Sequence, residues 1–275
     1  MSPLLRDRIE VFLSPTRVDL VRWSRGIKPK QRERQTATCV RDPDVPAWQP
    51  PLMQLKQMIP NGAGAEIAFL VSNHFVRYAV IPPHSKIETP AELYAYAAFQ
   101  MKEVYGDRVT AWEVSVSSWD AGGGAVCAAV ERDLLEELKD FAASDKMRLK
   151  SMEPYFASAF DHWHKRIDNS RAWFALVESG RFCLASLENG GWRRILNQRT
   201  MDGVEDELVA ALEREALLFS GKKEATEHVY LFAPEHPEFS IPEDAGWHTV
   251  YLQTESTPPP PHYPRAALIS AAGTE

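Results

Sequence analysis

The segment DHWHKR brings together residue types that bind metal ions. Asp161, His162 and His164 fall within this short run. The segment is predicted to be helical, and side chains two positions apart on a helix point about 200° away from each other. The two histidines therefore cannot hold one ion without distortion. An exposed helix end, with cationic groups near the negative pole of the helix dipole, explains the segment better.

Other chemical motifs are weak. No GxSxG nucleophile turn occurs, and AGGG lacks the GxGxxG order and opens a predicted strand, so it is predicted to be a turn. The three cysteines, Cys39, Cys127 and Cys183, lie far apart in apolar, strand-like runs. This spacing is typical of buried free thiols in a reducing compartment.

The composition excludes several classes of protein. The chain has 275 residues, of which 44% are hydrophobic, so it can bury a large core. Its formal net charge of -7 argues against nucleic acid as a partner. One local basic stretch is predicted to be a solvated loop: Lys28, Lys30, Arg32 and Arg34. The sequence shows neither a signal peptide nor a membrane span, which predicts a cytoplasmic protein.

The order of predicted elements indicates a mixed α/β fold. Strands are predicted at 8–13, 17–23, 34–41, 65–73, 74–82, 110–119, 125–131 and 148–154, and helices at 52–59, 90–105, 132–146 and 155–167. The strand at 74–82 either continues from 65–73 or pairs beside it. The helix at 90–105 has Thr89 as N-cap, Pro90 at its first position and Glu92 at its third.

The second half repeats the beginning of the first. RIEVFLSPTRVDLVRW and the strand after it predict a three-stranded meander, and RAWFALVESGRFCLASLENGGWRRI predicts another from Arg171. A helix at 202–220 and strands at 228–235 and 247–253 follow. This half lacks the last helix that the alternating order would supply.

With these segments, the chain resembles the actin-like assembly proteins of bacterial type IV pili and type II secretion, the PilM and GspL group. The resemblance covers roughly residues 8 to 252 and includes IAFLVSNHFVRYAVIP and ELYAYAAFQMKEVYG followed by WEVSVS. It implies an α/β, actin-like fold made of duplicated ribonuclease-H-like lobes with an inserted α/β region. The expected divisions are a first lobe at 1–170 with the insertion at about 73–120, a truncated second lobe at 171–254, and a flexible Pro-rich tail at 255–275.

The resemblance also directs attention to the first turn of each meander, because nucleotide-hydrolysing relatives place glycines and an Asp there. Backbone N–H groups then approach phosphates, and the carboxylate holds a metal ion through water. Here the first turn carries Pro15, and the second offers only Glu178, Ser179 and Gly180. These three are the candidate nucleotide-binding residues, although turn geometry alone explains them better. The glycine pair 190–191 is predicted to be a hairpin turn and not an adenosine site.

Two functional hypotheses follow. The first is a non-catalytic scaffold with no cofactor, which binds the short cytoplasmic tail of an inner-membrane assembly protein and so lies at the cytoplasmic face of the inner membrane. The inserted region would hold this tail, with Phe75 and Tyr78 as candidate anchors or as ordinary core residues. The alternative is an actin-like ATPase or a sugar-kinase-like phosphotransferase that uses ATP and Mg²⁺. The sequence leaves a homodimer open, and the Pro-rich tail is either a flexible terminus or a docking peptide.

Overall fold

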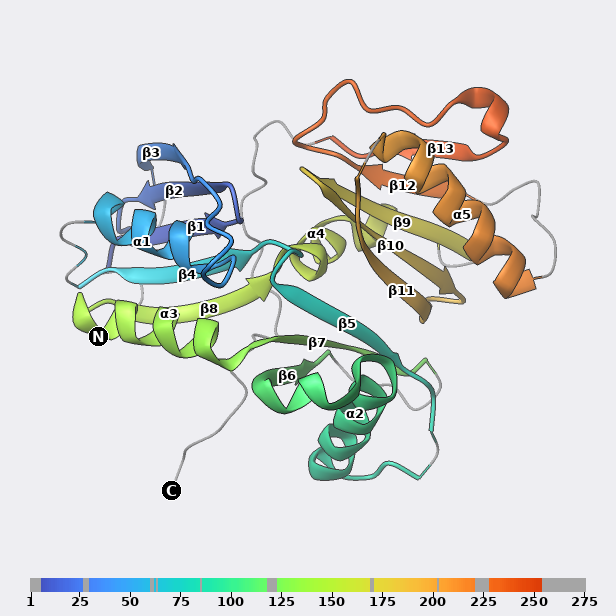
Figure 1. The fold of residues 1–275 in the computed structure, drawn as a ribbon, viewed down its shortest axis with the longest axis horizontal. Coiled ribbons are helices and arrows are strands. Elements are labelled where there is room, and N and C mark those ends of the chain that lie inside the picture. The colour runs from blue at the N-terminus through green and yellow to red at the C-terminus, as the bar shows by residue number, and fades with distance from the viewer. Residues whose placement is uncertain are drawn as a thin grey trace.

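The computed structural model describes residues 6–26, 30–59, 62, 64–84, 86–117, 123–168, 171–201, 203–220 and 228–253. Its strands form two five-stranded sheets and one three-stranded sheet (Figure 1). One five-stranded sheet comes from the first half of the chain, and the other comes from the residues after 170. None of the described helices is long and apolar enough to cross a membrane.

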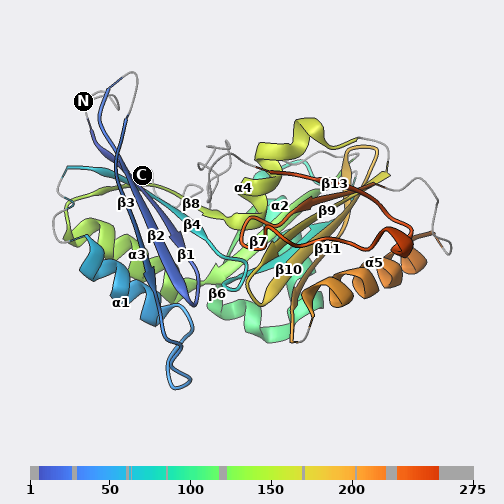
Figure 2. The same ribbon diagram turned by 90° about the horizontal axis from the view of Figure 1, so that it is seen from above.

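The first five-stranded sheet joins an antiparallel meander to two parallel strands. Its order is β3-β2-β1-β4-β8, in which β1, β4 and β8 run parallel. All residues of β4 are buried, as expected for a central strand that is covered on both faces. Helices α1 and α3 lie on one face of this sheet (Figure 2). The bounds are β1 Arg8–Leu13, β2 Arg17–Trp23, β3 Gln31–Thr38, α1 Gln49–Met58, β4 Glu66–Val71, α3 Arg132–Ser144 and β8 Arg148–Pro154.

The second five-stranded sheet repeats this topology. Its order is β11-β10-β9-β12-β13, again with an antiparallel meander followed by parallel strands. Helix α5 packs on it (Figure 1). Between β12 and β13 the chain carries only the short 3-10 helix η4, whereas the corresponding connection of the first half contains α3. The bounds are β9 Arg171–Glu178, β10 Arg181–Glu188, β11 Gly191–Arg199, α5 Val204–Ser220, β12 His228–Phe232, η4 Glu243–Ala245 and β13 His248–Tyr251.

The three-stranded sheet is inserted between β4 and β8. It has the antiparallel order β5-β7-β6, with β5 Val76–Ile81, β6 Trp112–Val116 and β7 Ala125–Glu131. Helix α2, Pro90–Tyr105, packs on it and begins with the predicted capping box. Thr89 Oγ1 accepts from the Glu92 amide at 3.2 Å, and the Glu92 carboxylate accepts from the Thr89 amide at 3.0 Å. The 3-10 helix η2, Gly106–Ala111, leads from α2 to β6.

One apolar core is shared by both five-stranded sheets. It contains Ile9 and Ile67 from the first sheet together with Phe174 and Leu176 from the second. Between them lies α4, Tyr155–Trp163, which continues into the 3-10 helix η3, His164–Arg166. The ring of Phe156 on α4 is 5.7 Å from that of Tyr78 and 5.3 Å from that of Phe174. Helix α4 therefore joins the two sheets through buried aromatic contacts.

Several predicted details change in the structure. Strands β4 and β5 belong to different sheets, so they neither form one ribbon nor pair. The prediction of a loop for the basic stretch was wrong for Arg32 and Arg34, which lie in β3, an edge strand whose exposed residues tolerate charge. Lys28 and the tail at 255–275 lie outside the described residues. Because β7 pairs with β5, we extend the proposed inserted region to Glu131, and the two-lobe division otherwise remains a prediction.

Candidate functional site

The candidate nucleotide turn is the tight connection between β9 and β10. Glu178 ends β9 and pairs with Arg181, the first residue of β10, so that Ser179 and Gly180 form the turn. Gly180 has a φ of 73°, a left-handed conformation that glycine adopts without steric cost. Ser179 and Gly180 are exposed, whereas Glu178 points into the protein.

Glu178 is engaged by the linker between β4 and β5. Its carboxylate accepts from the Ser72 hydroxyl at 2.6 Å, the Asn73 backbone amide at 3.1 Å and the Asn73 side-chain amide at 2.5 Å. Burial raises the pKa of Glu178 to about 7, the nearby Glu235 charge adds to this rise, and the bonds from Ser72 and Asn73 oppose it. The carboxylate joins the second five-stranded sheet to the first and does not face solvent, where a hydrated metal ion would have to lie.

The backbone of Ser179 is engaged as well. Its amide donates to Glu235 Oε2 at 2.9 Å, and its carbonyl oxygen accepts from His74 Nε2 at 3.0 Å. The other oxygen of Glu235 lies 2.7 Å from Nη2 of Arg17, at the start of β2. Arg17, Ser179 and Glu235 thus form one set of contacts across the two five-stranded sheets, called here the carboxylate clasp.

In the first turn, between β1 and β2, the Ser14 side chain forms hydrogen bonds with the backbone of the turn itself. Ser14 Oγ accepts from the Arg17 amide at 3.1 Å and lies 3.0 Å from the Arg17 carbonyl oxygen. Pro15 has no N–H to offer a phosphate. Within the described residues, no group of three or more His, Cys, Asp or Glu side chains could hold a metal ion. At both turns, polar groups that could face a phosphate or a metal ion are bonded within the chain itself.

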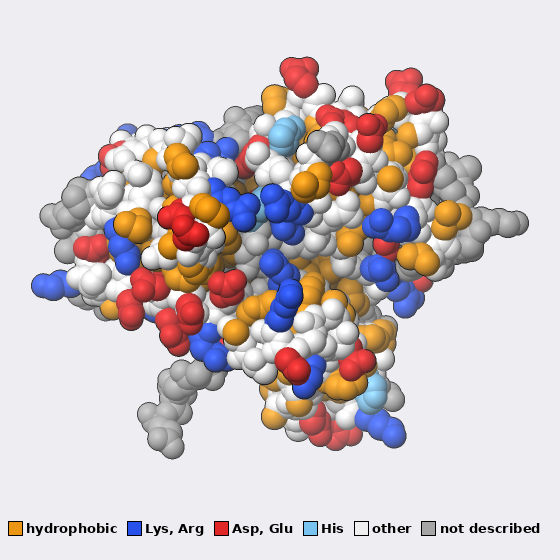
Figure 3. All heavy atoms as spheres, viewed as in Figure 1, with side chains coloured by type: hydrophobic (Ala, Val, Ile, Leu, Met, Phe, Trp, Pro, Cys, Tyr) orange, Lys and Arg blue, Asp and Glu red, His pale blue; other side chains and the backbone are white. Residues whose placement is uncertain are grey.

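Arginines gather around His74, where the three sheets meet. Burial lowers the pKa of His74 to about 4; its hydrogen bond to Ser179 opposes this change, and the charges of Arg181, Arg199 and Arg77 favour it. Figure 3 shows Lys and Arg side chains along the hollow at the centre of the molecule. The net charge of -7 is thus accompanied by a local positive surface.

A small pocket of about 120 Å³ lies between the first five-stranded sheet and the three-stranded sheet. Phe75, a predicted anchor, forms part of its wall, together with Ala47, Trp48, His74, Arg77, Trp112, Ala129, Glu131 and Leu134. Trp48 Nε1 donates to Glu131 Oε2 at 2.7 Å, so α1 and β7 are linked at its rim. The pocket can accept one apolar side chain beside the Arg77 cation.

Tyr78, the other predicted anchor, does not line this pocket. It is 3% exposed, and its hydroxyl donates to Asn73 Oδ1 at 2.6 Å. Its position supports the core role that the sequence analysis kept as an alternative, and its part in partner binding remains a prediction. Both residues are buried members of the shared apolar core, and Phe75, which is 8% exposed, also forms part of the pocket wall.

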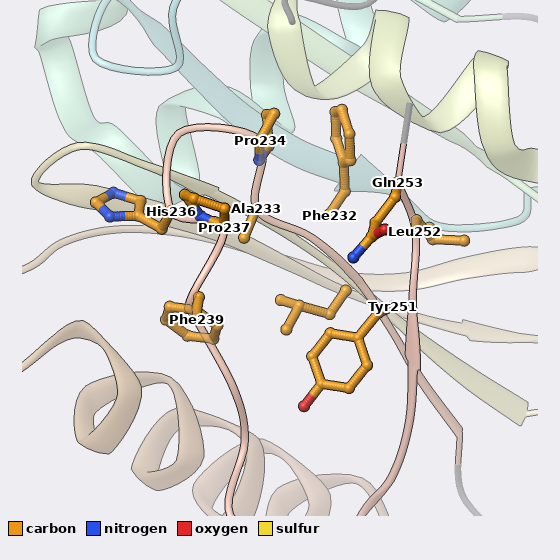
Figure 4. A pocket seen from close by; sticks show the side chains of 10 residues that line it. Phe232, Ala233, Pro234, His236, Pro237, Phe239, Tyr251, Leu252 and Gln253 are labelled. Carbon is orange, nitrogen blue, oxygen red and sulfur yellow. The ribbon is translucent and has the colours of Figure 1, made fainter. Parts of the chain in front are cut away.

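A second pocket, of about 250 Å³, lies at the carboxyl ends of β12 and β13 (Figure 4). Phe232, Phe239 and Tyr251 are among its lining residues, and the Tyr251 hydroxyl accepts from the Ile241 amide at 3.2 Å. The glycine pair 190–191 lies elsewhere, at the predicted hairpin, where Gly190 is in the β10–β11 turn and Gly191 begins β11. Proline and aromatic side chains therefore make up much of the wall of this second pocket.

Several important residues escaped the sequence analysis. Ser72 and Asn73 follow the buried run IAFLV, and polar residues directly after a central strand are a usable signal. Arg17 and Glu235 carry no such signal, because their contact joins residues 218 positions apart. Only the folded chain brings them together.

Comparison with protein-family models gives no match, and comparison with curated protein sequences gives none either. Solved structures do match. A structure of the PilM–PilN type IV pilus biogenesis complex aligns with a TM-score of 0.61 and 10% identity, covering 91% of this chain and 89% of that one. The cytoplasmic domain of EpsL, an inner-membrane component of the Vibrio cholerae type II secretion system, aligns with a TM-score of 0.54 and 12% identity, covering 90% of both chains.

A third match is a Bacteroides thetaiotaomicron protein with an actin-like ATPase fold and unknown function. Its TM-score is 0.55 and its identity 9%, covering 83% of this chain and 82% of that one. At such identities the similarity concerns the fold. The prediction of an α/β, actin-like fold is confirmed, and this chain is similar in fold to a chain of the PilM–PilN complex and to the cytoplasmic domain of EpsL.

Proposed function

We propose that this chain is a non-catalytic scaffold of a type IV pilus or type II secretion-like envelope machine. It lies at the cytoplasmic face of the inner membrane and binds the short cytoplasmic tail of a membrane-spanning assembly protein. The observation that carries the proposal is the likeness over about nine-tenths of the chain to the PilM–PilN complex and to cytoplasmic EpsL. A homodimer is compatible with this role.

The non-catalytic part of the proposal rests on the β9–β10 turn. Hydrolysis of ATP requires a carboxylate that can position a hydrated metal ion and amides that can approach the phosphates. Glu178 is buried and accepts three hydrogen bonds, and the Ser179 amide donates to Glu235. The Glu178 carboxylate and the Ser179 amide are therefore bonded to other groups of this chain and not directed at a metal ion or a phosphate.

The docking site that we propose for the tail is the pocket between α1, α3 and the three-stranded sheet. Its aromatic walls, including Phe75 and Trp112, suit one apolar side chain of an extended peptide, and Arg77 suits a neighbouring carboxylate. Strand β6, to which Trp112 belongs, is an edge of the three-stranded sheet and could pair with an added strand.

The test is a calorimetric titration with a synthetic peptide of the cytoplasmic tail of the single-span membrane protein encoded beside this gene. We expect saturable binding that Phe75→Leu or Trp112→Leu weakens about tenfold, since each removes an aromatic contact from the pocket. Phe99→Ala is the matched control, because Phe99 is 54% exposed on α2 and does not line the pocket. No binding to such a tail would refute the scaffold role, and equal binding by the folded pocket variants would move the site elsewhere.

The alternative function, an actin-like ATPase or a sugar-kinase-like phosphotransferase, makes the opposite prediction. Purified protein would turn over ATP, and Mg²⁺ with ATP would raise its melting temperature. Glu178→Ala would abolish both effects. We expect neither effect in the wild-type protein, because the residues at both turns are engaged by the chain itself.

A further inference from the structure

The two meander turns are connected by a carboxylate of the chain itself. Glu235 follows β12, and each of its oxygens has a different partner: Arg17 of the first sheet at 2.7 Å and the Ser179 amide of the second at 2.9 Å. The Ser179 amide belongs to the turn that would have to approach a phosphate, and it is not needed for pairing in the β9–β10 ladder, which resumes at Arg181. An anionic group therefore already occupies this donor.

The surroundings orient the arginine toward Glu235. Nε of Arg17 lies 2.8 Å from Asp19 Oδ2, and the other Asp19 oxygen accepts from the Thr36 hydroxyl at 2.6 Å. The Arg17 side chain is 29% exposed and that of Glu235 only 12%. Partial burial strengthens a charge-assisted hydrogen bond compared with one in open water, and a fixed guanidinium loses less entropy in making it.

We propose that the carboxylate clasp of Arg17, Ser179 and Glu235 is an internal substitute for a bound anion, which holds the two five-stranded sheets closed and excludes phosphate groups from the β9–β10 turn. A tethered carboxylate has a high effective concentration at the Ser179 amide, so a free anion competes at a disadvantage. The clasp would hold the two five-stranded sheets in one closed arrangement even when no nucleotide is bound. This inference does not depend on the scaffold role, since it concerns only the contact between the sheets.

Removing Glu235 should uncover the hidden donors. In Glu235→Ala, the Ser179 amide and one face of the Arg17 guanidinium lose their carboxylate, which leaves a small anion-binding site built from a turn amide and a cation. The probe is inorganic phosphate. Hydrogen exchange at the Ser179 amide reports directly on the site, because an exposed turn amide exchanges quickly unless it donates a hydrogen bond.

We expect the Ser179 amide of Glu235→Ala to exchange about tenfold faster than that of the wild type. Phosphate should restore part of this protection and raise the melting temperature of the variant, relative to chloride at equal ionic strength. The wild type should show neither response to phosphate. Glu238→Ala is the matched control, because Glu238 is an exposed acid of the same segment.

Unchanged exchange of the Ser179 amide in folded Glu235→Ala would overturn the proposal. Phosphate stabilisation of the wild type as large as that of the variant would do so too. If Glu235→Ala does not fold, Glu235→Gln preserves the shape of the side chain but replaces one oxygen with a donor that Arg17 cannot use. It should then show the same faster exchange to a smaller degree. Peptide binding in the pocket beside Phe75 is measured separately, so failure of either proposal is distinguishable from failure of the other.

Discussion

Asn73 uses its backbone and its side chain at once. Its Oδ1 accepts from the Tyr78 hydroxyl at 2.6 Å and from the Phe156 amide at 3.2 Å, while Nδ2 and the backbone amide donate to Glu178. Its carbonyl accepts from Asn197 Nδ2 at 2.9 Å. This buried residue therefore contacts the three-stranded sheet, α4 and the second five-stranded sheet together.

Replacing Asn73 should be costly. Asn73→Ala leaves the Tyr78 hydroxyl without its acceptor and removes one of the three hydrogen bonds to Glu178, and we expect the free energy of unfolding to fall by about 2–4 kcal/mol. Urea titration measures the change. Gln57→Ala, at an exposed position of α1, is the control and should lie within about 0.5 kcal/mol of the wild type. A loss for Asn73→Ala as small as that of the control would show that the network contributes little.

Glu153 on β8 predicts a pH dependence of stability. It is 3% exposed, and neither carboxylate oxygen has a hydrogen-bond partner in the described part of the chain. Burial raises its pKa from 4.5 to about 7; the nearby Ser151 hydroxyl and Arg8 oppose this rise, and the charges of Asp161 and Glu10 add to it. Because the folded pKa is the higher one, its stabilising contribution is full below about pH 4.5 and is lost as the pH rises through about 7.

Glu153→Gln should therefore stabilise the protein at pH 8, by about 1–3 kcal/mol, and have little effect at pH 4.5. Denaturant titrations at both pH values measure the difference. The control is Glu103→Gln, an exposed position of α2 where the two pH values should give the same result. A variant that is less stable than the wild type at pH 8 would contradict a raised pKa of Glu153 in the folded protein.

At the scale of elements, α2 shows how local sequence fixes a boundary. Thr89→Ala removes the oxygen that accepts from the Glu92 amide, and we expect a loss of about 1 kcal/mol in unfolding free energy. Thr89→Ser keeps a hydroxyl acceptor and should be nearly neutral. Guanidinium unfolding compares the two. Equal losses for both variants would mean that the threonine methyl, and not the cap, stabilises this end.

Local signals of this kind account for what the sequence could predict. The capping box, the alternating strands and the repeated meander were sufficient for α2 and for both meanders, and the actin-like fold followed from the family resemblance that these segments carry. Pairing between strands was harder, because β4 and β5 are adjacent in sequence and both apolar, yet a polar Ser72–Asn73 linker sends them into different sheets. The clasp could not be predicted from the sequence, since neither Arg17 nor Glu235 belongs to a motif and their contact depends on the whole fold.

At the scale of the whole molecule, the shared core decides how the chain unfolds. Residues of both five-stranded sheets belong to one apolar cluster, and α4 lies between the sheets with Phe156 only 1% exposed. Neither sheet can unfold without exposing part of the face that covers the other. Although the topology is duplicated, we expect the two halves to behave as one cooperative unit.

Calorimetry tests this expectation, because a single transition requires equal calorimetric and van't Hoff enthalpies. Amides of β4 and β9 should also lose protection from hydrogen exchange at the same denaturant concentration. Phe156→Ala, which opens a cavity in the shared core, should lower the free energy of unfolding by about 3–5 kcal/mol and shift both sheets together. Phe99→Ala, at an exposed aromatic residue, should shift neither. If Phe156→Ala moved only one sheet, the two halves would be separate folding units, and α4 would belong to one of them alone.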